Sequence, residues 1–274
     1  MVLLSNKLPY THPFAGGYPR RGGQPLPTDA DAIDYLGRVA AADGAAVEVG
    51  VAVAVDAFVK GCKADGIWTA LKASCLLCGP RTFNGATTAL VGDDPTPYNW
   101  SNFDYNRVTG LKGDGSTTYL DSNRAGDADG EYDRHVSVFV DDRGTKGGGA
   151  RYIASGTGNT NDTFINNLSA GSVISAVSNP SYDTVAYSGG GFLGSKRSIS
   201  TSFDFRVGGT TTPFSRTSGT PNAENFGIFC QSIGNLAFSD ARLAFYSIGS
   251  AISDLALLDT RITAYVAAVA AALA

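Results

Sequence analysis

Glutamates are scarce in this chain, and the spacing of its carboxylates limits the chemistry they can perform. The 274 residues include only three glutamates, Glu48, Glu131 and Glu224. A retaining glycosidase needs two carboxylates about 5 Å apart, commonly in an ExDxxE pattern. The nearest approach is Glu131-Tyr132-Asp133-Arg134-His135-Val136, in which a valine occupies the last position. Because the second carboxylate is missing from its place, we expect a solvated loop that leads into a strand. The alternative is a catalytic pair of Glu131 and Asp133 on one strand face.

Nucleophilic catalysis is equally poorly supported by the histidines. A catalytic triad needs a histidine poised beside a carboxylate and a nucleophile. His12 lies in a proline-rich stretch and His135 lies at the start of a strand-like run, and neither accompanies a recognisable serine motif. The sequence therefore predicts a protein that is not an enzyme and that needs no cofactor.

The acidic stretch from 127 to 133 is a candidate calcium loop. Its spacing resembles the DxDG arrangement in which carboxylate oxygens converge on calcium, although the complete 12-residue EF-hand pattern is absent. The alternative is a charged loop exposed to water. The candidate metal ligands are Asp127, Asp129, Glu131 and Asp133.

An aromatic cluster could form a sugar-binding platform. A sugar site pairs an aromatic face with nearby polar groups. Tyr98, Trp100, Phe103 and Tyr105 supply such rings, and we take Trp100 and Tyr105 as the candidate ligand-binding residues. The competing interpretation is that these rings cover the junction between the helical part and the β-sandwich.

The four cysteines predict structural thiols. Cys75 and Cys78 form one isolated CxxC, while Cys62 and Cys230 stand alone and no histidine lies near them in sequence. A zinc site would need two further ligands. We therefore expect small buried hydrophobic side chains in a protein that folds in a reducing cytoplasm.

Composition and charge favour a turn-rich β protein. The chain is 43% hydrophobic and 17% charged, has 34 glycines, and carries a formal net charge of -4. This balance offers no basic surface to a phosphate backbone, so we expect no nucleic-acid partner. The most apolar segment, from 265 to 274, has roughly half the length that a bilayer requires, so we expect no membrane partner.

Three regions of the chain should be mainly extended or helical. Residues 1–28 contain five prolines and predict an extended arm, for which Pro9, Pro13, Arg20 and Arg21 are the candidate assembly residues. Residues 29–78 predict a helical anchoring segment, with an N-cap at Thr28, a stop at Asp43-Gly44, a second helix around Val51 to Cys62, a third from Ile67 to Ala73, and an apolar strand at Cys75. Residues 254–274 predict a helix whose apolar stripe packs on the sandwich or on another subunit.

Residues 79–253 should form the β-sandwich. Short strand-like runs alternate with turn residues, which is typical of an antiparallel double sheet. The clearest run is Ile199 to Val207, where every second residue is hydrophobic or threonine. We therefore predict a mainly β protein, a jelly-roll (concanavalin A-like) antiparallel β-sandwich with short N-terminal helices and a C-terminal helix.

Three segments resemble bacteriophage particle proteins that contain a concanavalin A-like (LamG-type) jelly roll. They run from Gly61 to Gly79, from Tyr105 to Asn123, and from Arg242 to Asp259. The resemblance implies a virion or tail structural protein, folded in the host cytoplasm and tied to other virion proteins by its arm. It further implies a homo-oligomer, for which we expect a trimer.

The expected function is that of a non-enzymatic virion structural protein. A tail-fibre or tail-associated subunit is favoured because the resemblance is to projecting particle proteins. A capsid decoration (cement) protein is one alternative. A carbohydrate-binding module that recognises a host-surface glycan is another, and it can coexist with a role in a fibre.

Overall fold

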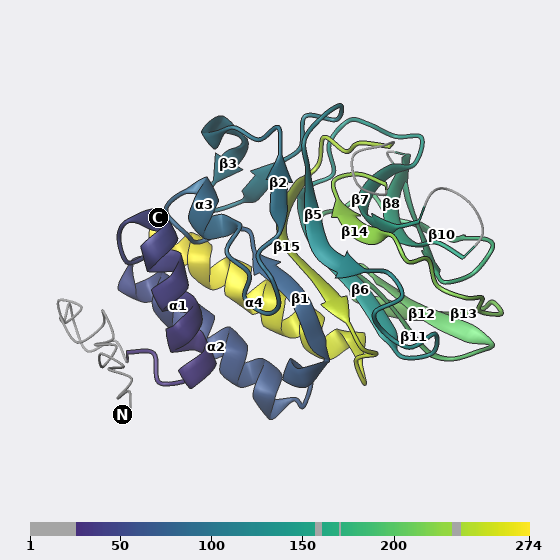
Figure 1. Cartoon of the computed structure of the whole chain (residues 1–274), viewed down its shortest axis with the longest axis horizontal. Coiled ribbons are helices and arrows are strands. Elements are labelled where there is room, and N and C mark those ends of the chain that lie inside the picture. Colours follow the sequence, from purple (N-terminus) through teal and green to yellow (C-terminus); the bar gives the residue numbers. More distant parts are fainter. Residues whose placement is uncertain (1–25, 157–160, 170, 232–236) are drawn as a thin grey trace, which may run out of the picture.

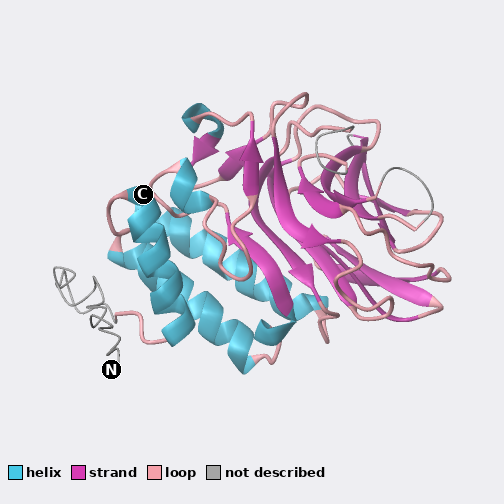
Figure 2. Ribbon diagram, viewed as in Figure 1, coloured by secondary structure: helices cyan, strands magenta, loops and turns pink. Residues whose placement is uncertain are grey.

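The computed structural model describes residues 26–274 except 157–160, 170 and 232–236. The predicted assembly residues Pro9, Pro13, Arg20 and Arg21 therefore lie outside the described residues, as does most of the predicted arm. Within the described residues, the chain forms a helical layer and two stacked β-sheets (Figures 1 and 2).

The helices come from both ends of the described chain. They are α1 (Ala30–Asp43), α2 (Val49–Ala64), the short α3 (Phe83–Ala86) and α4 (Leu255–Leu273), with two 3-10 turns, η2 (Trp68–Ala70) and η3 (Asn102–Asp104). Helices α1, α2 and α4 lie together on one side of the molecule, against the first sheet (Figure 2).

The first sheet has eight antiparallel strands in the order β13-β12-β11-β6-β15-β4-β3, with β1 also paired to β15. Their bounds are β1 (Leu71–Leu76), β3 (Tyr105–Asn106), β4 (Gly110–Lys112), β6 (Arg134–Asp142), β11 (Gly191–Ile199), β12 (Ser202–Val207), β13 (Thr210–Ser215) and β15 (Arg242–Gly249).

The second sheet has seven antiparallel strands in the order β10-β9-β8-β7-β14-β5-β2. Their bounds are β2 (Thr96–Tyr98), β5 (Tyr119–Ala125), β7 (Ala150–Ser155), β8 (Thr163–Ser169), β9 (Ser172–Val177), β10 (Asp183–Ala186) and β14 (Asn225–Ile228). The two sheets stack face to face, which confirms the predicted mainly β jelly-roll sandwich with helices at both ends.

Two hydrophobic cores hold these three layers together. One lies between the helices and the first sheet and includes Phe58, Phe245 and Leu258. The other lies between the two sheets and includes Val138, Ile165 and Phe205. Because the first sheet is covered on both faces, its central strands are buried almost throughout.

Helix α1 begins one residue later than predicted. Its N-cap is Asp29, whose carboxylate accepts from the backbone N–H groups of Asp31 and Ala32. The Thr28 N–H instead donates to Asp56 Oδ1 at 2.9 Å. The predicted stop is confirmed, because Gly44 takes the left-handed conformation at the C-cap.

The prediction of a third helix from Ile67 to Ala73 is wrong. Only Trp68–Ala70 forms a 3-10 turn, and the chain enters strand β1 at Leu71. Strand β1 pairs with β15 along almost its whole length, so hydrogen bonding to a distant strand overrides the local helical tendency. The end of the predicted helical segment therefore belongs to the first sheet.

The prediction of a single strand from Ile199 to Val207 is also wrong. The chain turns at Ser200-Thr201, so that Ile199 ends β11 and Ser202 begins β12. Phe203, Phe205 and Val207 are buried as the alternation predicts, but Ile199 is 52% exposed. No glycine, proline or asparagine marks this turn, which explains why the alternation concealed it.

Helix α4 packs on its own chain. Its side chains Leu255, Leu258, Ile262, Tyr265 and Val269 are buried against α2 and the first sheet. The helix has 19 residues and is long and apolar enough to cross a membrane by length and composition alone, which differs from the shorter segment considered from the sequence. One face of α4 nevertheless completes the core beneath the sheet.

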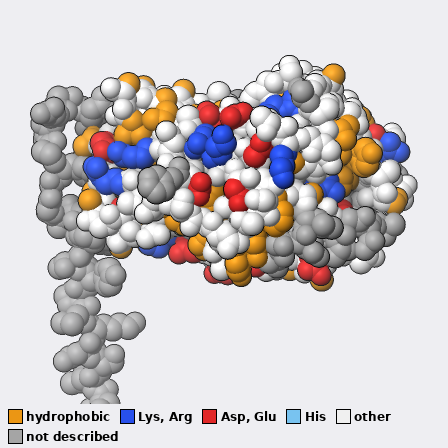
Figure 3. Space-filling view, turned by 90° about the horizontal axis from the view of Figure 1, so that it is seen from above, with side chains coloured by type: hydrophobic (Ala, Val, Ile, Leu, Met, Phe, Trp, Pro, Cys, Tyr) orange, Lys and Arg blue, Asp and Glu red, His pale blue; other side chains and the backbone are white. Residues whose placement is uncertain are grey.

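Charged side chains are mixed on the surface. On the face shown in Figure 3, lysines and arginines lie beside aspartates and glutamates, with hydrophobic groups between them. Ion pairs such as Arg206–Asp259 and Arg216–Asp183 join side chains of opposite charge.

Candidate functional site

The outward face of the seven-stranded sheet carries a group of side chains that do not belong to the core between the sheets. Alternation along β8 places Ile165 in that core, whereas Phe164 joins a separate small cluster with Ala154 and Ile174. Asn166, two residues after Phe164, shares its outward face. Arg151 on β7 is directly opposite Asn166 in the strand register.

These side chains line a cavity of about 370 Å³. Residues of β7, β8 and β9 line it together with the segment 179–182, Gln231 and Ala237. The lining residues are Gly148, Gly149, Arg151, Asp162, Phe164, Asn166, Leu168, Ile174, Asn179, Pro180, Ser181, Tyr182, Gln231 and Ala237. A cavity of this size is at the lower end of those that hold small ligands.

Two amide side chains at this cavity have unsatisfied hydrogen-bonding groups. Asn166 is completely buried, yet neither its Nδ2 nor its Oδ1 has a hydrogen-bond partner among the described residues. Gln231 is also buried, and its Nε2 likewise has no partner among them. An unsatisfied buried polar group costs about 1–3 kcal/mol. The cavity therefore contains donors and an acceptor that folding has not used.

Arg151 brings a positive charge to the same face. Its guanidinium carbon lies 4.0 Å from the centroid of the Phe164 ring, within the range of a cation–π contact. Its Nε and Nη2 donate to Gln231 Oε1 at 3.3 and 3.2 Å. Burial lowers the pKa of Arg151 to about 10, and the nearby Asp162 carboxylate opposes this shift. The guanidinium is therefore charged at neutral pH.

Tyr182 provides an aromatic ring at the cavity wall. It is 52% exposed, and its ring centroid lies 6.4 Å from that of Phe164. The preceding turn is held by Asn179, whose Oδ1 accepts from the backbone N–H of Val177 at 2.8 Å. An exposed ring beside unused amides and a cation can hold a ligand that has both an apolar face and several polar groups.

The predicted calcium ligands do not converge. Asp129 pairs with the Arg124 guanidinium, Glu131 Oε1 accepts from the Ser218 hydroxyl, and Asp133 Oδ1 accepts from the backbone N–H of Ala251. Asp127 is exposed. Across the described part of the chain, no three acidic, histidine or cysteine side chains are grouped closely enough to hold a metal. The acidic loop therefore lacks the arrangement that the calcium prediction required.

The two residues of the predicted sugar platform, Trp100 and Tyr105, each make a separate structural contact. The Trp100 indole packs against Phe83 and Phe229, and its Nε1 donates to the carbonyl of Tyr119 at 2.8 Å. The Tyr105 hydroxyl donates to the carbonyl of Pro80 at 2.6 Å. Both rings pack against the core between the sheets. Tyr105, which reaches the loop after Cys78, matches the alternative of a junction with the helical part, whereas Trp100 lies on the core between the sheets.

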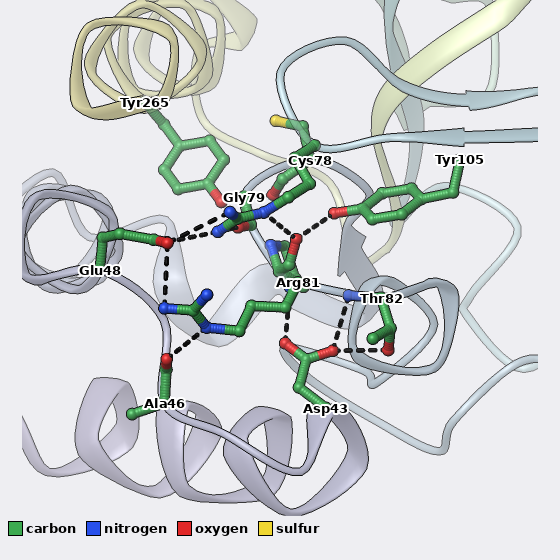
Figure 4. Close-up of polar contacts among 11 residues, drawn as sticks. Asp43, Ala46, Glu48, Cys78, Gly79, Arg81, Thr82, Tyr105 and Tyr265 are labelled. Carbon is green, nitrogen blue, oxygen red and sulfur yellow. Dashed lines mark hydrogen bonds and ion pairs between the residues drawn. The ribbon is translucent and has the colours of Figure 1, made fainter. Parts of the chain in front are cut away.

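Tyr105 belongs to a polar cluster that connects the helices to the sandwich (Figure 4). At its centre, the Glu48 carboxylate pairs with Arg81 and Arg107, and these contacts hold the pKa of Glu48 below its ordinary value against the opposing effect of burial. The Tyr265 hydroxyl on α4 donates to the carbonyl of Cys78 at 2.8 Å. These groups satisfy one another, so the cluster serves to fix the loop after Cys78.

His135 and the cysteines are structural in this arrangement. His135 is buried between the Ser250 carbonyl and the Ser247 hydroxyl, and burial lowers its pKa to about 4. All four cysteines are buried and none of them is in a disulfide, as the sequence predicts. Burial raises the pKa of Cys75 and of Cys78 to about 12. Neither thiol is therefore ionised at neutral pH.

Comparisons with known proteins give only distant likenesses. No protein-family model matches the sequence, and no curated protein matches it. A mutant of Trypanosoma rangeli sialidase that displays trans-sialidase activity is similar with a TM-score of 0.48 and 9% identity, over 77% of this chain and 38% of that chain. The chain thus spans well under half of that sialidase.

Two further structures show likeness of the same order. The Ruminococcus gnavus sialidase module CBM40, bound to α2,3-sialyllactose, has a TM-score of 0.36 and 11% identity, over 48% of this chain and 82% of that chain. The binding domain of botulinum neurotoxin serotype D has a TM-score of 0.43 and 10% identity, over 71% and 51%. Likeness this slight does not indicate what the present chain binds.

Sequence reasoning missed the cavity residues. Within β8, the pair Asn166-Asn167 interrupts an otherwise apolar run, and buried amides in a strand are a signal that could have been used. The Asn179-Pro180-Ser181-Tyr182 turn gave a second signal, a proline turn that carries an aromatic residue. Gln231 could not be placed, because it reaches the site from a distant loop.

Proposed function

We propose that this chain is a carbohydrate-binding protein, and that the cavity on the outward face of the seven-stranded sheet is its binding site. The observation that carries the proposal is the completely buried Asn166, whose amide donor and acceptor both lack partners among the described residues. A sugar hydroxyl both donates and accepts, so sugar hydroxyls can satisfy both ends of such an amide.

The other cavity residues support the same class of ligand. Tyr182 exposes a ring on which the apolar face of a sugar can stack, and Gln231 Nε2 supplies a further donor. A purely apolar ligand would leave these polar groups unsatisfied, at a cost of about 1–3 kcal/mol for each. A polyhydroxylated ligand with one apolar face therefore fits the cavity better.

The proposed activity is binding without chemical conversion. Glu131 and Asp133, the residues nearest to a glycosidase pattern, are each engaged in a structural hydrogen bond, to Ser218 and to Ala251 respectively. Neither residue lines the cavity. The binding proposal therefore requires no cofactor.

As a second function, we propose that the protein is a subunit of a bacteriophage particle, most consistent with a tail fibre and alternatively a capsid cement protein. The three segments that resemble phage particle proteins contain β1, β4 and β15, and β15 hydrogen-bonds to both of the others. The resemblance therefore falls on one connected framework. The cavity residues lie outside it, so a virion location and glycan binding are compatible in one trimeric fibre.

A glycan array tests the binding proposal. We expect the purified full-length protein to bind a defined set of glycans, with and without calcium. Asn166→Leu and Tyr182→Ala should each weaken that binding at least tenfold. Tyr132→Ala is the matched control, because Tyr132 is an exposed tyrosine that does not line the cavity. Absence of glycan binding by the unaltered protein, or equal binding by all three variants, would refute the proposal.

The virion proposal has a separate test. Antibodies against the sandwich should label purified phage particles at a fixed location, at the tail for a fibre and over the head for a cement protein. Deleting residues 1–25, which include Pro9, Pro13, Arg20 and Arg21, should abolish incorporation. Particles that contain no such chain would rule out this second function and leave the first untouched.

A further inference from the structure

Among the described residues, three arginines are buried: Arg134, Arg143 and Arg197. Arg134 donates to the carbonyls of Gly126, Asp129 and Gly130, with distances between 2.6 and 3.1 Å. Arg197 donates to five backbone carbonyls and to the Asn179 side chain. In both cases, backbone oxygens surround the guanidinium and compensate for its burial.

A second cavity shows the same pattern. It has a volume of about 320 Å³ and is lined by Arg143 among others. The Nη2 of Arg143 donates to the carbonyls of Ser169 and Ser172 at 2.7 and 2.8 Å. The donors of Arg143 are therefore directed into the protein.

Arg151 differs from these three arginines. The only side-chain acceptor that it contacts among the described residues is Gln231 Oε1, and both hydrogen bonds are long, at 3.2 and 3.3 Å. No described carboxylate lies within ion-pair distance of its guanidinium, and Nη1 donates to none of the described residues. Arg151, which lines the cavity, therefore has hydrogen-bond donors left for a ligand.

The remaining charged group at the cavity is Asp162. Its Oδ1 accepts from Asn222 Nδ2 at 3.0 Å, and it forms no ion pair with Arg151. Asp162 is therefore held by other contacts, while the guanidinium carbon of Arg151 lies 4.0 Å from the centroid of the Phe164 ring. A planar guanidinium binds a carboxylate through two parallel hydrogen bonds, an arrangement that a hydroxyl cannot reproduce.

We propose that the ligand is an acidic sugar, a uronic or sialic acid, and that Arg151 binds its carboxylate while Asn166 and Gln231 bind its neutral polar groups. This inference rests on the carbohydrate-binding function proposed above. The carboxylate would supply the acceptors that Arg151 lacks, and the ring of Tyr182 would contact the sugar face. Arg151 is thus the residue that determines specificity for charge.

The experiment compares pairs of ligands that differ at one group. Glycans ending in glucuronic acid or sialic acid are measured by calorimetry against their carboxyl-reduced counterparts, with the full-length protein. Loss of a charge-assisted pair costs about 1.5–3 kcal/mol, so we expect reduction to weaken binding roughly 10- to 150-fold. Arg151→Met should remove that preference, and Arg151→Lys should retain only part of it.

Lys112→Met is the control for charge, because it removes one positive charge from an exposed position in the other sheet. It should leave the preference unchanged. The comparison of acidic and reduced glycans uses the unaltered protein, so it holds even if Arg151→Met fails to fold.

Each contrary result has a distinct meaning. Equal binding of acidic and reduced glycans, or binding of sulfated glycans alone, would overturn this inference and leave carbohydrate binding in place. Failure to bind any glycan would overturn both proposals.

Discussion

Asn166 and Asn167 are neighbours in β8, but their side chains lie on opposite faces of the sheet. Only the Asn167 side chain has hydrogen-bond partners among the described residues. The Asn167 Nδ2 donates to the carbonyls of Arg143 and Lys146, and its Oδ1 accepts from Arg143. Neither the Nδ2 nor the Oδ1 of Asn166 forms a hydrogen bond in the described structure. Two identical side chains, one residue apart, thus have different energetic roles.

This contrast predicts opposite effects of the same substitution. Asn166→Leu removes an unsatisfied buried amide and keeps a similar volume, so we expect the free energy of unfolding to rise by about 1–3 kcal/mol. Asn167→Leu removes three hydrogen bonds and leaves Arg143 without one acceptor, so we expect a loss of about 2–4 kcal/mol. Urea denaturation measures both. If Asn166→Leu destabilised the protein as much as Asn167→Leu, Asn166 would be structural.

His135 predicts a dependence of stability on pH. Burial lowers its pKa to about 4 in the folded protein, from 6.5 in the unfolded chain. As the pH falls below about 6.5, the unfolded chain takes up the proton first, so stability decreases until the pH reaches about 4 and then levels off. The expected loss is ~3 kcal/mol.

The variant His135→Gln should flatten this part of the pH profile. Thermal unfolding of the wild type and of the variant, measured between pH 4 and pH 7, compares the two profiles. A wild-type profile with no slope from the histidine, or an unchanged profile in the variant, would contradict the burial argument.

Asp56 fastens the start of α1 to α2. It is buried and accepts from the backbone N–H groups of Thr28 and Asp29 at 2.9 and 2.8 Å and from the Lys60 ammonium at 2.6 Å. We expect Asp56→Ala to cost about 2–3 kcal/mol. Asp34→Ala, which removes an exposed pair with Arg38, should cost less than about 0.5 kcal/mol.

The Asp56 carboxyl group also makes the stability of the protein depend on pH in acid. Burial opposes ionisation of Asp56, but its hydrogen bonds to Lys60, Asp29 and Thr28 outweigh burial and hold its pKa below the ordinary value of 3.8. Its contribution is complete above that value and disappears as the pH falls through the lower pKa of the folded state. Equal acid sensitivity of wild type and Asp56→Ala would disagree with this account.

Ile262 tests the role of α4. Its side chain is completely buried between the helices and the first sheet, so Ile262→Ala should lower the free energy of unfolding by about 2–5 kcal/mol. Ala264→Ser on the exposed face of the same helix should change it by less than about 0.5 kcal/mol. A small effect of Ile262→Ala would mean that α4 is not part of the core.

The sequence by itself determined the class of most elements, the segment from Ile67 to Ala73 being an exception. The alternation in 136–140 and the helical spacing in 255–269 are local properties of the chain and can be recognised without a fold. The stop at Gly44 likewise depends on a single residue. The shortage of glutamate and histidine was equally visible, since it needs no coordinates.

Only the tertiary structure decided where one strand ends and which side chains meet. The turn at Ser200-Thr201 contains no residue type that signals a turn. The pairing of β1 with β15 depends on hydrogen bonds between residues far apart in sequence. The candidate site depends on such contacts too, because Arg151, Asn166, Tyr182 and Gln231 lie on four segments. Whether a buried amide is satisfied is a property of its neighbours in space, and no local pattern records it.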